Sequence, residues 1–154
     1  MIQEEKQLLL QDICTRLPCG VKVWYKYGTW YPEKFATSIR LADEKIALSH
    51  KFNKEGDWFP VEEAGEILIK PYLRPMSSMT EEEKKEYIEC ACYEIEESVN
   101  GRHYEYYLKD FCGTTDNPLV NTDGVDWLNA HHFDYRGLIE KNLALDCTGL
   151  HIYD

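Results

Sequence analysis

The segment IKPYLRPMSSMTEEE, residues 69–83, contains the change from strand to helix around which the fold is organised. The run from 66 to 73 is predicted to be a strand, with Arg74 placed at its exit. The connector that follows ends at Thr80, and Thr80 and Glu83 have the spacing of a capping box, in which each side chain accepts a backbone N–H of the other residue. The segment therefore predicts a strand that leads through a short connector into a helix.

Four further runs upstream carry the β-branched and aromatic residues that are typical of strands. They cover residues 21–27, 35–41, 45–49 and 57–61. Residues 42–44 have the composition of a hairpin turn between the second and the third of these runs. Five short strands at such close spacing predict a small antiparallel N-terminal sheet, and we interpret this sheet as a partly open barrel of the SH3-like kind.

Three helices are predicted to pack against the sheet. The first shows an amphipathic pattern in which Leu9, Ile13 and Leu17 recur at four-residue intervals, with Asp12 among its polar residues. The second begins at the capping box, and the third has Asp123 as a natural N-cap. The helices are expected at 2–17, 80–99 and 125–132, which makes the fold class α+β.

The chain of 154 residues is long enough for one domain with a substantial core and short for two. We therefore expect a single domain over 1–154, in which 1–74 is rich in sheet and 75–154 is rich in helix. No apolar run approaches the roughly 20 residues that cross a bilayer, and acidic residues stand where a signal peptide carries positive charge. These features predict a soluble, cytoplasmic protein that has no association with a membrane.

The net charge is −11, from 17 basic and 28 acidic residues. Such a charge repels nucleic acid phosphates, so no direct nucleic acid binding is expected. An acidic protein can instead bind a partner with a basic surface, including a surface that normally holds DNA. The plainer interpretation is that the charge keeps a small domain soluble. The glutamates of the second helix carry the same two interpretations, a solvated face or an imitation of phosphates.

The cysteines are interpreted as reduced thiols, because the sequence has no export signal and predicts a core that does not need disulfides. They are Cys14, Cys19, Cys90, Cys92, Cys112 and Cys147. Their spacings differ from the paired C-x2-C of zinc sites. A metal site that combined some of them with His103, His131 or His132 is the alternative. We expect no cofactor and no metal.

Several stretches resemble an uncharacterised family of small acidic proteins from Bacteroides-type gut bacteria and their prophages and mobile elements. The resemblance is carried by LP and GVKV within 17–23, KPYLRPMSSMTEE at 70–82, HFDYRGLI at 132–139, and LALD with TGL at 143–150. It implies a genetic context and no particular activity. Where this family has glycine before the final Leu-Ala, the chain has Asn142, which tolerates a left-handed turn better than other non-glycine residues do.

The stretch HFDYRGLI also raises the question of a catalytic cluster. His131 and His132 could serve as a general base or as ligands, with Asp134 to orient an imidazole. Neighbouring residues on a helix point about 100° apart, however, so both histidines cannot serve one site without a break in the helix. We interpret the stretch as a helix exit in which Phe133 or Tyr135 is anchored in the core, and in which Gly137 turns the chain.

No catalytic residue is predicted. The candidate binding residues are two tryptophans from a dense aromatic stretch and the aromatic or charged side chains at a predicted strand end and a predicted helix exit: Trp24, Trp30, Tyr72, Arg74, His132, Asp134, Tyr135 and Arg136. The leading hypothesis is a non-enzymatic accessory protein of a prophage or mobile element that binds and blocks a host protein such as a defence factor. The second is a protein that sequesters a small anionic ligand, a nucleotide signal. The third is an enzyme that uses the region of His131, His132 and Asp134.

Overall fold

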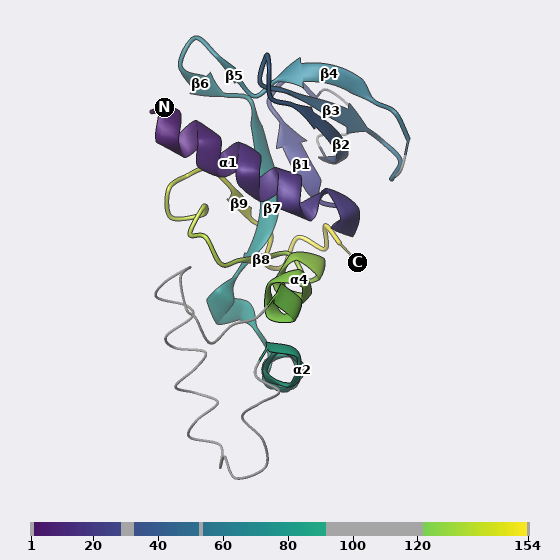
Figure 1. Ribbon diagram of the computed structural model, residues 1–154, viewed down its shortest axis with the longest axis vertical. Helices are drawn as coiled ribbons and strands as arrows, with labels where there is room; N and C mark the ends of the chain where they lie inside the picture. The colour runs from purple at the N-terminus through teal and green to yellow at the C-terminus, as the bar shows by residue number, and fades with distance from the viewer. Residues whose placement is uncertain (1, 29–32, 53, 92–121, 154) are drawn as a thin grey trace. The chain divides into compact units, whose positions relative to one another are not determined.

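The computed structural model describes residues 2–28, 33–52, 54–91 and 122–153 (Figure 1). Helices and a mixed sheet are both present, which confirms the α+β class. The chain divides into two compact units. We call Met1–Leu73 together with Leu138–Asp154 the sheet unit, and Arg74–Gly137 the helical unit. Residues 138–154 therefore belong to the sheet unit, whereas we expected all of 75–154 to form the helix-rich part.

The sheet unit contains the predicted antiparallel strands. They are β1 (Lys22–Tyr25), β2 (Glu33–Arg40), β3 (Lys45–Ser49), β4 (Asp57–Pro60) and β7 (Ile69–Pro75), in the spatial order β4-β3-β2-β1-β7. A small second hairpin pairs β5 (Glu62–Glu63) with β6 (Glu66–Ile67). The described pairings form an open path of strands, and barrel closure stays a prediction. One parallel partner was not predicted, namely β9 (Leu145–Asp146) beside β7.

Turn chemistry at two predicted positions agrees with the sequence. The β2–β3 hairpin turns at Glu44, whose φ is 55°. Asn142 has a φ of 59°, so it occupies the left-handed conformation that was expected of it. Asparagine is one of the few non-glycine residues that tolerate such an angle, whereas the turn at 42–44 was predicted from its place between two strands.

The core of the sheet unit lies between the sheet and α1 (Gln3–Arg16), which crosses one face of the strands (Figure 1). From the helix, Leu9 and Ile13 are completely buried, as their spacing predicted. From the strands, Val23 and Ile46 are also completely buried. Burial of such aliphatic side chains contributes about 1.5–3 kcal/mol each relative to exposure, so this cluster is the main source of the stability of the unit.

An ion pair is buried on the same face of α1. Asp12 and Arg16 are both 0% exposed, and the Arg16 Nε and Nη2 atoms donate to the two Asp12 carboxylate oxygens at 2.9 and 3.1 Å. The amphipathic pattern counted Asp12 as one of the polar residues of the helix. Asp12 lies three positions after Leu9 and Arg16 three positions after Ile13, however, so the helical periodicity itself places the pair on the buried stripe.

The C-terminal residues of the sheet unit pack against β1 and β7. The Tyr153 hydroxyl accepts the backbone N–H of Lys22 at 2.9 Å and donates to the carbonyl of Tyr72 at 2.8 Å. The Lys22 ammonium donates to the Ile152 carbonyl at 2.7 Å. Burial raises the pKa of the Tyr153 hydroxyl far above its usual range. The phenol thus joins the backbones of two neighbouring strands just beyond their last paired residues, Val23 and Pro71.

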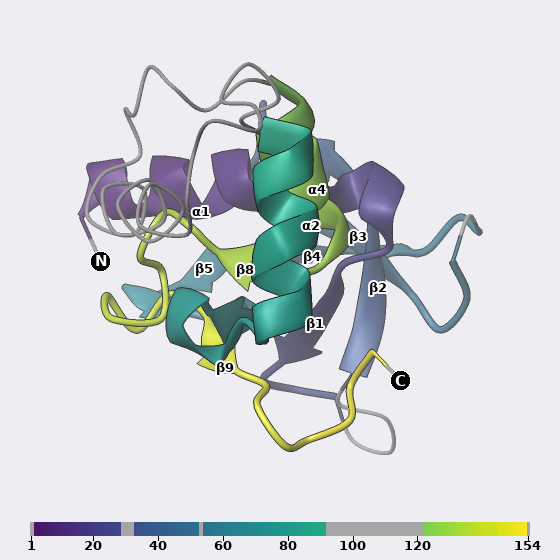
Figure 2. The ribbon, with the colours of Figure 1, turned by 90° about the horizontal axis from the view of Figure 1, so that it is seen from below.

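The helical unit is built on α2 (Glu81–Ala91) and α4 (Thr122–Ala130), which lie side by side (Figure 2). The Thr80 N–H donates to Glu83 Oε1 and the Glu83 N–H donates to Thr80 Oγ1, both at 3.1 Å, which confirms the capping box. The part of the second predicted helix beyond Ala91 lies outside the described residues. The short strand β8 (Phe133–Asp134) pairs in parallel with the end of β7.

A separate apolar cluster holds the helical unit together. Its buried members are Met79, Tyr87, Ile88, Leu128, Phe133 and Tyr135. The last described helix begins three residues before the predicted start at 125 and ends at Ala130, two residues before the predicted end at 132. His132 has a φ of 64°, which helical geometry does not allow, so the chain turns there and enters β8.

Candidate functional site

The side chain of Arg74 joins the end of β7 to the start of α2. Its guanidinium donates to both carboxylate oxygens of Glu83, at 2.7 and 2.8 Å, and lies 4.2 Å from the centre of the Phe133 ring. Its backbone N–H donates to the His132 carbonyl at 2.7 Å. The hydrogen-bonded guanidinium lowers the pKa of Glu83 to about 2, although partial burial acts in the opposite direction. These contacts support a structural role for Arg74.

The stretch after α4 has the form that was predicted for a helix exit. Phe133 and Tyr135 are both buried, and the Tyr135 hydroxyl donates to the Asn129 side-chain oxygen at 2.8 Å. The Arg136 guanidinium lies 4.6 Å from the centre of the Tyr135 ring. Gly137 has a φ of 75°, which confirms that the glycine is needed for the turn. Asp134 is a buried residue, 8% exposed.

The two histidines do not form an open catalytic pair. The His131 ring stacks on Trp127 with 3.8 Å between ring centres, and its Nδ1 is 2.8 Å from the Trp127 carbonyl oxygen. His132 occupies a left-handed turn, and both side chains are half-buried. Within the described residues, no three His, Cys, Asp or Glu side chains are grouped closely enough to hold a metal ion. The geometry accounts for both histidines as parts of the helix exit.

The remaining predicted residues belong to the other unit or lie outside the described residues. Tyr72 is buried in a small cluster of the sheet unit with Cys147 and Ile152, and Trp24 packs against that cluster. Trp30 lies outside the described residues. The structure therefore gathers Arg74, His132, Asp134, Tyr135 and Arg136 around β8, while Trp24 and Tyr72 form part of the core of the sheet unit.

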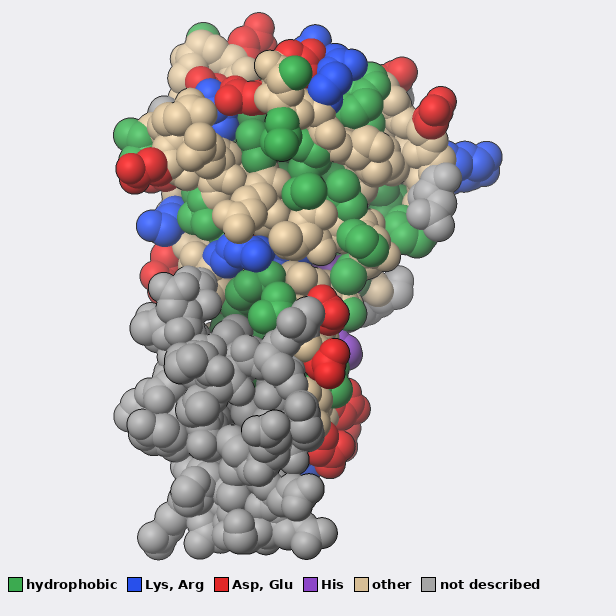
Figure 3. Space-filling model, viewed as in Figure 1, with side chains coloured by type: hydrophobic (Ala, Val, Ile, Leu, Met, Phe, Trp, Pro, Cys, Tyr) green, Lys and Arg blue, Asp and Glu red, His purple; other side chains and the backbone are tan. Residues whose placement is uncertain are grey.

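A surface that the sequence did not single out lies at the β2–β3 turn. The Arg40 guanidinium donates to the two carboxylate oxygens of Asp43 at 2.8 and 2.7 Å, and it lies 4.6 Å from the centre of the Trp58 ring on β4. Trp58 is 39% exposed and Leu41 is 69% exposed. Over this turn and β4, Figure 3 shows hydrophobic, basic and acidic side chains next to one another. We call these four residues the Trp58 surface.

The sequence contains residue types at these positions that are typical of binding surfaces, but it does not show which of its aromatic residues are exposed. Tryptophan and arginine are common in binding hot spots, yet every aromatic residue in a small sheet is also a candidate for the core. In the structure Trp58 is exposed, and it lies on the same face of the sheet as Ser38 because both residues pair with Ala47. This pairing could not be read from a single strand.

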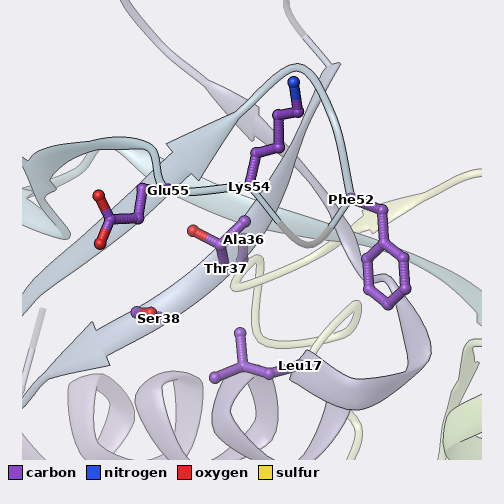
Figure 4. A pocket seen from close by; sticks show the side chains of 7 residues that line it. All are labelled: Leu17, Ala36, Thr37, Ser38, Phe52, Lys54 and Glu55. Carbon is purple, nitrogen blue, oxygen red and sulfur yellow. The ribbon is translucent and has the colours of Figure 1, made fainter.

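A hollow of about 230 Å³ lies in the sheet unit beside β2 (Figure 4). Its lining comes from the end of the first helix, from β2 and from the loop between β3 and β4. The residues are Leu17, Ala36, Thr37, Ser38, Phe52, Lys54 and Glu55. The β2–β3 pairing shifts register between Ala36 and Ser38, which is a bulge of the kind that often lies next to binding sites.

Comparisons with known proteins add no family assignment. No protein-family model, curated protein or solved structure matches the chain. None of the helices in the described ranges is long and apolar enough to cross a membrane. The functional argument therefore depends on the geometry of the two units themselves.

Proposed function

We propose that the protein is a non-enzymatic accessory protein of a prophage or mobile element, and that it binds and blocks a host protein through the Trp58 surface. The observation that carries this proposal is the exposed tryptophan with an arginine stacked on its ring. Tryptophan and arginine dominate the residues whose truncation costs most at protein interfaces. The genetic context rests on the sequence resemblance.

The Trp58 surface is organised before any partner arrives. Asp43 holds the Arg40 guanidinium by two hydrogen bonds and fixes it over the indole ring. Each member of this ion pair shifts the pKa of the other, raising that of Arg40 and lowering that of Asp43. Side chains that are already ordered lose less entropy on binding, and this favours affinity. Leu41 adds exposed apolar area on the same turn.

The proposed partner has a basic surface. The chain has a net charge of −11, and long-range attraction of this kind raises the rate of encounter with a positively charged protein. The apolar and aromatic groups of the Trp58 surface would then provide the short-range contact. A basic partner surface that normally holds DNA fits the same charge requirement.

The contacts of the arginines favour this function over the sequestering of a nucleotide signal. Both Arg40 and Arg74 donate to carboxylates of their own unit, Asp43 and Glu83. A nucleotide phosphate would have to compete with these carboxylates. The enzyme hypothesis has less support than either, because His131 is stacked on Trp127 and bonded to its carbonyl group.

The proposal is tested by comparative capture followed by a binding measurement. The whole chain, its Trp58→Ala variant and a Leu150→Ala control would be immobilised and exposed to lysate of a Bacteroides-type host. Leu150 is a matched control because it is 55% exposed and does not belong to the Trp58 surface. A protein retained by the wild type and the control, and lost from Trp58→Ala, would be purified for titration.

With the purified partner, Trp58→Ala is expected to weaken binding about 30-fold, the loss that corresponds to a hot spot of about 2 kcal/mol. Binding to a basic partner is also expected to weaken as salt is added. Equal affinity of the wild type and Trp58→Ala would contradict the assignment of the surface. If no protein is retained by the wild type, the proposed function itself is wrong.

A further inference from the structure

We infer that the outer edge of β4 is a docking site for an extended segment of the partner protein, which adds to the sheet as a further antiparallel strand. The segment has β-branched residues followed by one lysine or arginine. This inference rests on the proposed function for the existence of a protein partner and deepens it, because Trp58 lies on β4. The direction of the backbone groups of β4 and the charges beside them carry it.

The strand β4 is the last strand on one side of the sheet (Figure 1). Within the residues that the structure describes, it pairs with β3 alone. Its first two residues, Asp57 and Trp58, are exposed. An edge strand of this kind presents N–H and C=O groups to which a second chain can bond, and several classes of protein bind extended peptides in this way.

The pairing with β3 determines which backbone groups of β4 point outwards. Facing residues of an antiparallel pair alternate between those that bond to each other and those whose N–H and C=O groups point away. Val61 donates to the Glu44 carbonyl at 3.2 Å, one position beyond the last pair of the register. In steps of two from Val61, Phe59 also bonds to β3, whereas Trp58 and Pro60 direct their backbone groups to the edge.

Two observations agree with this assignment. Ala47, which lies opposite Trp58, directs its carbonyl away from β4, because that carbonyl accepts the Thr37 hydroxyl at 3.3 Å. Pro60 has no N–H, and proline is tolerated in strands where the N–H would face away from the sheet. The edge therefore offers the N–H and C=O of Trp58 and the C=O of Pro60. An added antiparallel strand can bond to all three, and antiparallel pairing is the more stable per residue.

The side chains of the sheet restrict the sequence of the added strand. Trp58 shares its face with Arg40 and Lys45, and both cations lie near Asp43, at 2.7 and 3.9 Å. An uncharged residue opposite Trp58 fits this face, and a β-branched residue pairs favourably with an aromatic one across two strands. On the other face Phe59 packs against the core, which favours an apolar residue opposite it.

The charge complementarity comes from Asp57. Its side chain is exposed, and among the described residues none forms an ion pair or hydrogen bond with its carboxylate. A lysine or arginine opposite Asp57 on the added strand lies within reach of that carboxylate. A second copy of the chain fits the edge less well, because each copy has a net charge of −11.

The test uses the whole chain and the blocked peptide acetyl-Ser-Thr-Val-Thr-Lys-Ser-amide, whose four central residues face β4 from Pro60 to Asp57. We expect saturable binding in the millimolar range by NMR titration. At ten times the Kd, hydrogen exchange of the Trp58 amide should slow about tenfold, since the bound state protects it. The Phe59 amide, which already bonds to β3, should change little.

Two N-methylated peptides of equal composition and charge separate strand addition from side-chain contact. Methylation of the second threonine removes the N–H that bonds to the Trp58 carbonyl, and should abolish binding. Methylation of the lysine removes an N–H that faces away from β4, and should be tolerated.

Two variants of the chain locate the basic residue of the segment. Asp57→Lys should weaken the peptide about two- to fivefold, the effect of one exposed ion pair. Glu63→Lys is the matched control, because it makes the same change in net charge at an exposed residue of β5 and should leave the affinity unchanged.

Three outcomes would overturn the inference. They are the absence of saturable peptide binding, equal effects of the two methylations, and self-association of the chain that protects the Trp58 amide without peptide. The proposed function fails separately. A captured protein that depends on Trp58, together with a Trp58 amide that the peptide leaves unprotected, would remove strand addition alone. Protection of that amide by the peptide with no captured protein would support the edge site and contradict the proposed function.

Discussion

Each of the two units contains an arginine–carboxylate pair with similar hydrogen-bond lengths and a different environment. In the sheet unit, Asp12 and Arg16 lie one helical turn apart and are completely buried. In the helical unit, Arg74 and Glu83 link a strand end to a helix start, with side chains that are 26% and 18% exposed. A third pair, Arg40 with Asp43, is 46% and 41% exposed at the β2–β3 turn.

The comparison separates the presence of an ion pair from its effect on stability. A buried pair gains little over a well-packed apolar pair, because both charges lose their hydration, but removal of one partner leaves a charge without compensation. A partly exposed pair keeps some hydration, and solvent screens the loss of a partner. We therefore expect the cost of breaking these pairs to follow their burial, although their hydrogen bonds have nearly the same length.

The largest effect is expected for Asp12→Ala. Loss of the carboxylate removes two charge-assisted hydrogen bonds from the buried Arg16 guanidinium, which should lower the free energy of unfolding by about 3–5 kcal/mol. Urea titration followed by circular dichroism measures this change. The double variant Asp12→Leu with Arg16→Met is the control and should recover most of the loss. A cost for Asp12→Ala no larger than that for Glu83→Gln would contradict the dependence on burial.

Tyr153→Phe extends the comparison to a buried group without charge. The change leaves the Lys22 N–H and the Tyr72 carbonyl without the phenol, and should cost about 1–3 kcal/mol of unfolding free energy. The sign of the pH dependence is also fixed. Because the pKa is raised in the folded protein, the phenol contributes fully below its ordinary pKa of 10.0, and its contribution is lost as the pH rises above that value. The stabilities of the wild-type chain and the variant should therefore converge in alkaline solution. A difference that stayed constant with pH would contradict the contribution of the Tyr153 hydroxyl to stability.

Glu83→Gln tests the partly exposed pair. Glutamine keeps the capping geometry at this position, so the expected cost of about 1–2 kcal/mol reports mainly the loss of the charge beside Arg74. The pKa of Glu83 is lowered to about 2 from 4.5, so the stabilisation is complete above about pH 4.5 and is lost as the pH falls towards 2. The variant should lack this part of the acid-dependent loss, which thermal unfolding across that pH range would reveal. If the variant lost as much stability in acid as the wild type does, Glu83 would not be the group whose protonation causes the loss.

The smallest effect is expected for Arg40→Gln, at the exposed end of the series. The denaturation midpoint should not change measurably, since the pair is open to solvent on both sides. Affinity for the captured partner should nevertheless fall, because the arginine stacked on Trp58 belongs to the proposed binding surface. A clear loss of stability would show that exposure does not order the three pairs.

Local chemistry decided which parts of this fold could be predicted. The capping box of Thr80 and Glu83, the turn at Gly137 and the left-handed Asn142 each depend on residue types that few alternatives can replace. The five antiparallel strands followed from composition and spacing in the same way. These features require no knowledge of distant parts of the chain.

Features that depend on distant partners were not predicted. The pairing of β9 with β7 joins residues about seventy positions apart, and the hollow beside β2 is completed by a loop and a helix end. The same limit applies to the candidate binding residues. Tyr72 and Arg74 are close in sequence, yet one is buried in the core of the sheet unit and the other joins β7 to α2 in the helical unit.

The phenol of Tyr153 has a consequence for the order of folding. It bonds to Lys22 across 131 positions of the chain, and the whole helical unit is inserted between Leu73 and Leu138. Closing so long a loop costs entropy that grows with the length of flexible chain, and an insertion that has already folded shortens that length. During synthesis, β1 to β7 emerge long before Tyr153 does. The helical unit can therefore act as a folded spacer whose formation speeds the docking of the last residues, which makes that docking a late kinetic step.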